Sequence, residues 1–300
     1  MHHVETVRLD ARGVAELKQR VYGYMLATRR DKYEPWVRGI ERYKHWALLA
    51  ERYGVPLGVR YFTEASARVE LIEAIYIAMR LVDDFVDKDA PLPDGWRSSV
   101  AYVEAFVEAL ETGRLRSDIP GSLLRYAFDI GEALRIDMRP SVRDILMSLH
   151  FDAKRQESPA MLFFERETLE HHFHLLDIRG TVGGCLAVTR EPQGSWQLIE
   201  PLGVATRIRY NVRDLDEDLR ARLCNIPLED IERFRIRNVL DTTSVEMCNW
   251  KRMEALRGLD LLDMYRERKH ELSLHFFTNT VLRRAYEQPA TRYLKEASTS

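Results

Sequence analysis

Apolar residues recur at helical spacing along almost the whole chain. Between residues 62 and 87, for example, Leu71, Ile75 and Met79 follow one another at intervals of four, which places them on one face of an α-helix. No series of alternating strands or Asn-Gly hairpin signals accompanies this pattern. The same spacing predicts helices over residues 13–30, 36–53, 62–87, 98–112, 120–137, 166–190, 197–222 and 244–287.

The segments that interrupt the helical pattern are short and contain proline or glycine. They cover residues 88–97, 115–121, 139–140 and 190–195, and none is long enough for a linker between domains. The sequence shows no internal repeat or low-complexity tract. We therefore expect an all-α helical bundle that folds as a single domain over residues 1–300.

Composition excludes several classes of protein. The formal net charge of −2 gives no reason to expect a nucleic acid as partner, because nucleic-acid-binding proteins usually carry an excess of basic residues. The three cysteines lack CxxC spacing, which favours a reducing compartment without disulfides. No apolar run approaches the roughly 18–20 residues of a membrane span, and the first residues lack the apolar core of a secretory signal. We expect a cytoplasmic protein.

The residues that carry chemistry begin with a DDxxD motif near the end of the helix predicted for 62–87. Asp83 and Asp87 are four residues apart, so their carboxylates share one face, about 40° apart around the helix. Like charges at this spacing destabilise a helix, and we expect a cation to compensate. Arg80 lies one turn earlier on the same side. Taken alone, a motif of this kind is more often a solvated acidic face.

A second acidic run lies on the helix predicted for 197–222. Asp214 and Asp218 are again four residues apart, with Asp216 and Glu217 between them and Arg213 adjacent. Two pairs of carboxylates suit Mg²⁺, which prefers oxygen ligands and bridges to substrate phosphates. A metal ion together with arginine stabilises the charge that develops on a leaving diphosphate. A pair of surface salt-bridge ladders is the alternative interpretation.

Three blocks of the sequence resemble motifs of the squalene/phytoene synthase family. LVDDFVD resembles the first aspartate-rich motif of that family, and RDLDEDLRARLCNIPLEDIERFRI resembles the second motif and the segment after it. Between them, HLLDIRGTVGG is similar to a glycine-containing helix that lines the family's lipid cavity. The resemblance covers roughly residues 55–240 and implies an isoprenoid-synthase bundle with a central cavity. The segment 1–54, which we expect to be helical, is atypical for the family.

The resemblance also implies roles for individual residues. The residues expected to bind Mg²⁺ and support ionisation are Asp83, Asp87, Asp214 and Asp218. The residues expected to contact the diphosphate or line its site are Arg80, Arg213, Arg207, Tyr76 and Tyr210.

The chain departs from the family pattern at several of these positions. Arg207 and Tyr210 stand where the family usually has Gln and Asn. That Asn is itself a metal ligand, and Asn211 here lies about 100° further round the helix. Asn225 replaces a tyrosine of the family. Arg179 replaces a small residue before GTVG, and we expect its side chain to point into the central cavity, where a buried charge requires an acid or a ligand anion.

These departures favour an unusual acceptor. Head-to-head condensation of two prenyl diphosphates requires space for two lipid chains, and a guanidinium at Arg179 would shorten or polarise that space. We therefore expect a Mg²⁺-dependent prenyltransferase that ionises an allylic prenyl diphosphate (dimethylallyl, geranyl or farnesyl). The prenyl group would pass to a small electron-rich aromatic acceptor, such as a carbazole-type metabolite of secondary metabolism, oriented by Arg179 or Asp177. Peripheral membrane contact stays open, because prenyl substrates partition into lipid.

Three alternatives remain at this point. The first is head-to-head synthesis of the squalene or phytoene type, and the second is terpene cyclisation. The third is a non-catalytic helper protein on the same fold. Four acidic motif residues argue against the helper protein, because a scaffold has no use for the repulsion between like charges.

The remaining polar and aromatic clusters are interpreted as structural. HHFH spreads His171, His172 and His174 around a helix, which disfavours a shared metal. The cysteines lack a neighbouring base and receive no catalytic role. An aromatic-rich N-terminal set is assigned to core packing, with an aromatic wall for an acceptor or cation as the alternative. It consists of Tyr22, Tyr24, Tyr33, Trp36, Tyr43, Trp46 and Tyr53.

Overall fold

The computed structural model describes residues 11–28, 33–34, 37–42, 44–45, 48, 64–272 and 276–299. Contacts between Cα atoms divide the chain into two compact units, which we call unit 1 (Met1–Leu146) and unit 2 (Met147–Ser300). Each unit has buried apolar side chains of its own. The organisation of residues 1–300 as a single domain stays a prediction.

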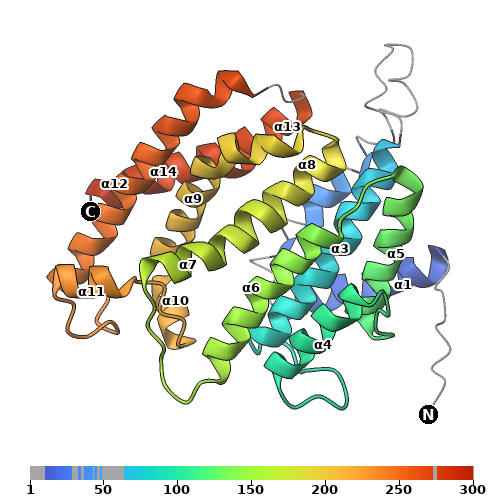
Figure 1. Cartoon of the computed structure of the whole chain (residues 1–300), viewed down its shortest axis with the longest axis horizontal. Helices are drawn as coiled ribbons and strands as arrows, with labels where there is room; N and C mark the ends of the chain where they lie inside the picture. Colours follow the sequence, from blue (N-terminus) through green and yellow to red (C-terminus); the bar gives the residue numbers. More distant parts are fainter. Residues whose placement is uncertain are drawn as a thin grey trace. The chain divides into compact units, whose positions relative to one another are not determined.

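Helix α3 (Ala65–Val86) is the central element of unit 1. It packs against α1 (Ala11–Thr28), α4 (Ser99–Glu111) and α5 (Ile119–Leu134), the blue-to-green helices of Figure 1. Its apolar spacing explains this position, because the residues at intervals of three and four face its neighbours. The buried apolar residues of α3 include Leu71, Ala74, Ile75, Ala78, Val82 and Phe85.

Side-chain caps fix where several of these helices begin. The Ser98 hydroxyl accepts the backbone N–H of Ala101 (3.1 Å), and the Asp118 carboxylate accepts that of Gly121 (3.0 Å). Each cap satisfies an N–H group that has no partner inside its helix. The boundary between the two units falls within the next helix, α6 (Arg139–Glu157).

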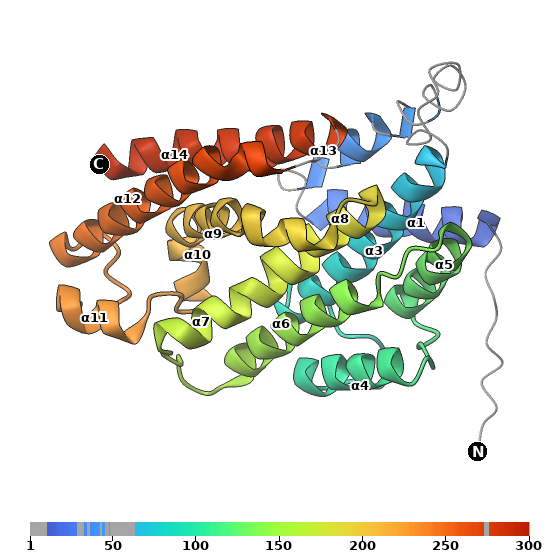
Figure 2. The ribbon, with the colours of Figure 1, turned by 45° about the horizontal axis from the view of Figure 1, so that its top comes forward.

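Helix α9 (Trp196–Arg213) is the central element of unit 2. It packs against the wide-turn π-helix η2 (His174–Val182), α12 (Val245–Arg268) and α14 (Gln288–Thr299). Figure 2 shows α12 and α14 side by side. Apolar residues of α9 belong to a buried core cluster that also contains residues of α12 and α14. The other elements of unit 2 are α7 (Arg166–Phe173), α8 (Gly183–Thr189), α10 (Leu215–Arg220), α11 (Leu228–Phe234), α13 (Phe276–Val281) and η5 (Leu282–Glu287).

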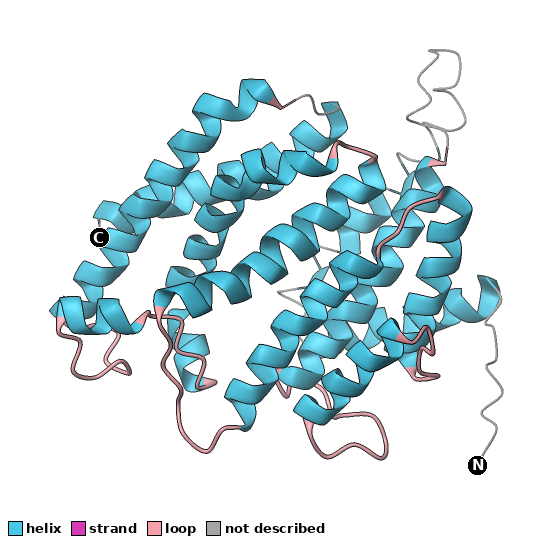
Figure 3. Ribbon diagram, in the orientation of Figure 1, coloured by secondary structure: helices cyan, strands magenta, loops and turns pink. Residues whose placement is uncertain are grey.

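The all-α prediction is confirmed. Figure 3 shows helices joined by loops and no strand in the part of the chain that the structure describes, and the one isolated bridge pairs Leu162 with Leu223. The helices predicted for 62–87, 98–112, 120–137 and 166–190 are confirmed apart from their end residues. None of the described helices is long and apolar enough to cross a bilayer.

Four sequence expectations about helices were wrong or incomplete. The predicted helix 197–222 is interrupted at Asp214. In the range predicted as one helix over 244–287, the first helix ends at Arg268. Helix α6 was not predicted, and the supposed break at 139–140 is its first turn, where a proline loses no helical hydrogen bond. The short α11 was also missed. Most of the predicted helix 36–53 lies outside the described residues.

Candidate functional site

The first aspartate-rich segment lies at the C-terminal end of α3. Arg80 Nη1 is 2.6 Å from Asp83 Oδ2, and Arg80 Nε is 3.3 Å from Asp84 Oδ1. The hydroxyl of Tyr33 accepts a hydrogen bond from Arg80 Nε (2.6 Å) and donates one to Asp84 (2.7 Å). The predicted compensation of the Asp83 charge by Arg80 is therefore confirmed. The buried residues Asp84 and Tyr33 also bind the guanidinium of Arg80.

Asp83 and Asp87 remain partly exposed at the end of this helix. The backbone N–H of Asp87 caps α3 by donating to the carbonyl of Asp83 (2.8 Å), so the two residues are one turn apart as predicted. Tyr76 is partly buried on the same helix. Burial alone would lower the pKa of Arg80, but the nearby Asp83, Tyr33 and Asp84 outweigh it and raise that pKa, so this arginine stays charged.

The second aspartate-rich segment lies at the junction of α9 and α10. Arg213 donates two hydrogen bonds of 2.6 Å to the carboxylate of Asp214. Although α9 ends there, the N–H of Asp218 still bonds to the carbonyl of Asp214 (2.9 Å), which keeps the two residues one turn apart. Asp216 and Glu217, the other acids of the run, are exposed.

Asp218 is held by a side chain from the loop after α10. Asn225 Nδ2 donates to Asp218 Oδ2 (2.9 Å). Burial and the neighbouring Asp214 raise the pKa of Asp218 to about 7, against the opposing effects of Arg207 and Asn225. The second segment therefore contains a pair of carboxylates whose mutual repulsion a cation would relieve.

A row of buried polar residues that contact one another connects Asn225 to α6 and α7. Arg155 is 1% exposed, and its Nη2 donates to Asn225 Oδ1 and to the Cys224 carbonyl (both 2.9 Å). Its Nη1 donates to Asp152 (2.9 Å), and Asp152 contacts the ring of His172 (3.3 Å). The spacing of residues along the sequence does not predict this row of contacts.

Contacts within this row keep Asp152 ionised and hold the ring of His172 in place. Burial would raise the pKa of Asp152, but the charges and hydrogen bonds of His172 and Arg155 lower it to about 2. His172 Nδ1 is 2.9 Å from the hydroxyl of Ser148, and this hydroxyl is completely buried. His172 is thus a core histidine, as the sequence analysis favoured, and its neighbours His171 and His174 lie apart from it at less buried positions.

Arg207 and Arg179 differ in their surroundings. Arg207 is bound by both oxygens of Asp177 (2.6 and 2.9 Å) and lies over the ring of Phe173 (4.7 Å). Arg179 is exposed. Residues two positions apart on a helix point to nearly opposite sides. Asp177 and Arg179 are so related, and the side of η2 on which Asp177 binds Arg207 therefore does not carry Arg179.

Tyr210 and Asn211 lie near the end of α9. The ring of Tyr210 lies 4.9 Å from the guanidinium carbon of Arg213 and 5.0 Å from that of Arg209, which agrees with a place beside the second acidic segment. Asn211 faces another way, and its buried Oδ1 has no hydrogen-bond partner among the described residues. An unpaired buried acceptor is costly unless a ligand or water satisfies it.

Unit 2 contains a pocket of about 980 Å³ beside these residues. Its walls come from α7 and η2, from α9 and from α12, and Asn225 contributes to its lining. Arg207, Asp177 and Asn211 line this pocket, whereas Arg179, Tyr210 and the motif aspartates do not. Within the described part of unit 2, this pocket is lined by Arg207 and not by Arg179. The role expected for Arg179 stays a prediction.

The cysteines and the N-terminal aromatic residues complete the list of candidates. All three cysteines are free thiols. Tyr33 is buried and bound to the first acidic segment, and Tyr22 hydrogen-bonds to Glu73 on α3. These contacts show polar anchoring as well as core packing. The other members of the aromatic set, Trp36, Tyr43, Trp46 and Tyr53, lie outside the described residues.

The chain has the all-α fold of isoprenoid synthases of the squalene/phytoene synthase type. It is similar to a dehydrosqualene synthase solved in complex with a ligand, with 16% identity and a TM-score of 0.54 over 95% of this chain and 98% of that one. It is also similar to the squalene synthase HpnC from Alicyclobacillus acidocaldarius, with 14% identity and a TM-score of 0.56 over 97% and 95%. No protein-family model and no curated protein matches the sequence.

Proposed function

We propose that this protein is a Mg²⁺-dependent prenyltransferase that ionises an allylic prenyl diphosphate. The observation that carries the proposal is the joint occurrence of two features. The chain shares the fold of two isoprenoid synthases along nearly its whole length, and it keeps two aspartate pairs, each with an adjacent arginine. A fold by itself does not fix a function, so the argument depends on the aspartate pairs.

The donor set fits Mg²⁺. Asp83 and Asp87 offer partly exposed carboxylates one turn apart, and Asp214 and Asp218 offer a second pair. Burial and the charge of Asp214 raise the pKa of Asp218 in spite of Arg207, and a cation bound between the two carboxylates would oppose this rise. A bound Mg²⁺ would supply charge stabilisation for the leaving diphosphate. The residues proposed to hold Mg²⁺ are Asp83 and Asp87 in unit 1 and, as a separate pair, Asp214 and Asp218 in unit 2.

The protein's own cations would orient the diphosphate. Arg80 and Arg213 each already bind a motif aspartate (2.6 Å in both cases), and both keep further N–H groups for phosphate oxygens. Tyr33 holds Arg80 from behind, so this arginine would not need to reorganise when substrate binds. The residues proposed to contact or surround the diphosphate are Arg80, Arg213, Tyr76 and Tyr210, whereas Arg207 is bound to both oxygens of Asp177 and is proposed to act on the acceptor.

The acceptor in this proposal is a small molecule other than a second prenyl diphosphate. Asp177 with its partner Arg207 would orient an electron-rich aromatic acceptor for capture of the allylic cation. The second candidate function is head-to-head synthesis, and the names of the two similar structures, a dehydrosqualene synthase and a squalene synthase, favour it. The cytoplasmic location and any peripheral membrane contact belong to the same proposal.

Product analysis tests the proposal. The protein is incubated with Mg²⁺ and dimethylallyl, geranyl or farnesyl diphosphate, with and without an aromatic acceptor such as a carbazole, and both diphosphate release and prenylated products are measured. Release that depends on the acceptor supports the proposed function. A C30 hydrocarbon from farnesyl diphosphate supports head-to-head synthesis, and a cyclic hydrocarbon supports terpene cyclisation. No release under any of these conditions would leave only a non-catalytic role.

A further inference from the structure

The pocket of unit 2 has an uneven distribution of charge. Six carboxylate side chains and four arginines line it. Each of these arginines is already bound to a carboxylate in the described structure. The pairs are Arg166 with Asp230 (2.6 Å), Arg207 with Asp177 (2.6 Å), Arg257 with Glu254 (2.8 Å) and Arg268 with Glu271 (3.2 Å). The arginines therefore add little positive potential inside the pocket.

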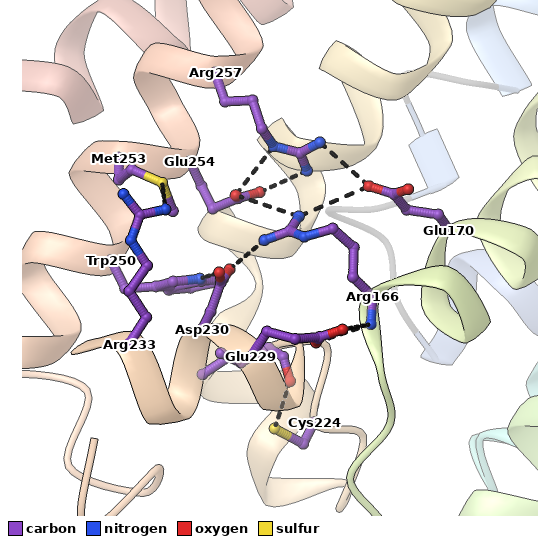
Figure 4. A network of polar contacts seen from close by, with 11 residues as sticks. Arg166, Glu170, Cys224, Glu229, Asp230, Arg233, Trp250, Met253, Glu254 and Arg257 are labelled. Carbon is purple, nitrogen blue, oxygen red and sulfur yellow. Dashed lines mark hydrogen bonds and ion pairs between the residues drawn. The ribbon is translucent and has the colours of Figure 1, made fainter. Parts of the chain in front are cut away.

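Figure 4 shows how completely two of these arginines are surrounded. Arg166 and Arg257 lie side by side between Glu254 and Glu170, which are on opposite sides of them. Asp230 holds the far end of Arg166 and also accepts the indole N–H of Trp250 (3.0 Å). An anionic ligand would have to displace these contacts before it could bind either arginine.

Three carboxylates of the pocket have no arginine or lysine partner among the described residues. Glu229 accepts only the backbone N–H of Arg166 (3.0 and 3.1 Å), and Glu200 lies 3.1 Å from the ring of His174. Glu167 is exposed at the start of α7. The surplus charge in the pocket is thus negative, and it comes from side chains that are not already paired with a guanidinium or ammonium group.

The remaining lining combines an apolar surface with one unpaired acceptor. Phe173, Ile178, Val204 and Leu261 supply apolar area on four different elements. Asn211 Oδ1 is buried in this lining without a hydrogen-bond partner among the described residues. An N–H group of a ligand would satisfy it.

We propose that this pocket binds a small molecule that has an apolar ring and a protonated amine. Its volume of about 980 Å³ suits a ligand of that size. A prenyl diphosphate is excluded from this pocket because its charge repels the unpaired carboxylates. A second hydrocarbon chain is disfavoured because it would bury charged groups without giving them partners.

The position of the pocket relates this ligand to the reaction. Asn225 lines the pocket and also donates to Asp218 (2.9 Å), so a molecule in the pocket lies against the side chain that holds a motif aspartate. We therefore assign the ring of the bound molecule as the acceptor of the prenyl group. A ring carbon would form the bond to the allylic carbon as the bond from that carbon to the diphosphate oxygen breaks, and the proton lost from the ring would pass to a carboxylate of the pocket. This assignment rests on the proposed function, whereas the binding site itself does not.

Calorimetry with three indole compounds tests the site without any prenyl diphosphate. Tryptamine carries an ammonium group, tryptophol is neutral and indole-3-propionate carries a carboxylate, while the ring is the same. At pH 8, where imidazole side chains are largely neutral, we expect tryptamine to bind about tenfold or more tightly than indole-3-propionate, with tryptophol between them. Equal or tighter binding of indole-3-propionate, or no binding of tryptamine, would overturn the proposal.

Variants place the binding in the pocket. Glu229→Gln and Glu200→Gln should each weaken tryptamine binding by about two- to fivefold, on the scale of a partly exposed ion pair. Glu267→Gln on α12 removes the same charge from an exposed position outside the pocket and should leave the affinity unchanged. If both pocket variants bind tryptamine as the wild type does, the site is elsewhere and the proposal fails.

The acceptor role is tested separately by prenylation of tryptamine with dimethylallyl diphosphate and Mg²⁺. Charge-dependent binding without release of diphosphate from any prenyl donor would keep the site and refute the proposed function. Diphosphate release in the absence of charge-dependent binding would refute the site and keep the proposed function.

Discussion

Asn225 connects a proposed metal ligand to the interior of unit 2. It donates to Asp218 and accepts from Arg155, whose guanidinium is also bound to Asp152. Because every group in this row is buried or bound on both sides, the orientation of the Asp218 carboxylate is fixed before any metal binds. Groups that orient metal ligands typically change metal affinity by about 10- to 100-fold when they are removed.

We therefore expect Asn225→Ala to raise the Mg²⁺ concentration needed for half-maximal diphosphate release by about tenfold or more. Binding of Mn²⁺ without substrate, followed by electron paramagnetic resonance, should weaken in parallel. Asn249→Ala, at an exposed position on α12, is the matched control. An unchanged Mg²⁺ requirement in the Asn225 variant would show that Asp218 does not depend on this hydrogen bond.

The three cysteines differ in how readily a reagent can reach and modify their thiols. Burial raises the pKa of Cys185 to about 11 and also raises the pKa of Cys224, whereas Cys248 is exposed. We expect iodoacetamide to modify Cys248 first at pH 7 to 9, while Cys185 stays slow. Peptide mass spectrometry after a short pulse measures all three rates.

The raised pKa of Cys185 also determines the sign of its effect on stability. The folded state keeps this proton to a higher pH than the unfolded chain does, whose cysteines titrate near about 8.5. The contribution of this thiol to stability is therefore fully present below about pH 8.5 and is lost as the pH rises towards 11. Rapid alkylation of Cys185 at pH 8 would contradict the raised pKa of its thiol.

Sequence spacing could predict local pairs of residues but not distant ones. Arg80 and Asp83 are one turn apart on a helix, so their ion pair follows from periodicity. Arg207 and Asp177 are 30 residues apart, and their bidentate pair exists only because η2 packs on α9. For the same reason the sequence placed the emphasis on Arg179, whereas the described pocket presents Arg207.

At the scale of elements, Gly203 allows η2 and α9 to approach closely. A Cβ atom at this position would lie 2.1 Å from Cδ1 of Ile178, which is buried on η2. We expect Gly203→Ala to lower the free energy of unfolding by about 1–2 kcal/mol, because a side-chain tip must move inside a packed core. Urea unfolding followed by circular dichroism measures the change.

A second substitution distinguishes this clash from a general effect of alanine. Ile178→Val removes the Cδ1 atom, so the double variant should be more stable than the sum of the two single effects predicts. Gly194→Ala is the control, because a Cβ atom there meets nothing within 4 Å. Additive effects of the two substitutions would show that the cost of Gly203→Ala has another origin.

Helix α6 shows why one element escaped prediction. Its buried residues Val142, Leu146 and Leu149 share one face, but Ser148 and Arg155 are buried on another side, about 100° or more further round the helix. Burial of polar residues on a second side weakens the helical signal that identifies amphipathic helices. These polar residues belong to the row that supports Asp218, so the feature that hid the helix is the one that matters for the site.

At the scale of the whole molecule, the fold followed from the sequence more completely than the site did. Helical periodicity was sufficient for the all-α class, and the three motif blocks were sufficient for the likeness to squalene-type synthases. The polar lining of the unit 2 pocket comes from α7, η2, α9, α12 and the loop around Asn225. These segments are brought together by packing, and the spacing of residues along the chain does not predict which segments pack together.

The last prediction concerns the response of the whole chain to substrate. A ligand that binds only the native state raises the free energy of unfolding by about 2.7 kcal/mol at a hundred times its Kd. A non-ionising thiolo analogue of geranyl diphosphate should therefore raise the Tm when Mg²⁺ is present and much less when it is absent.

Asp83→Asn and Asp214→Asn should each abolish most of this increase and lower turnover by at least about a hundredfold. Asp216→Asn, at an exposed position of the same acidic run, should change neither quantity. If Asp214→Asn removes the increase in Tm and Asp83→Asn leaves it intact, the first motif does not bind the metal–diphosphate complex, and the assignment of Asp83 and Asp87 is wrong.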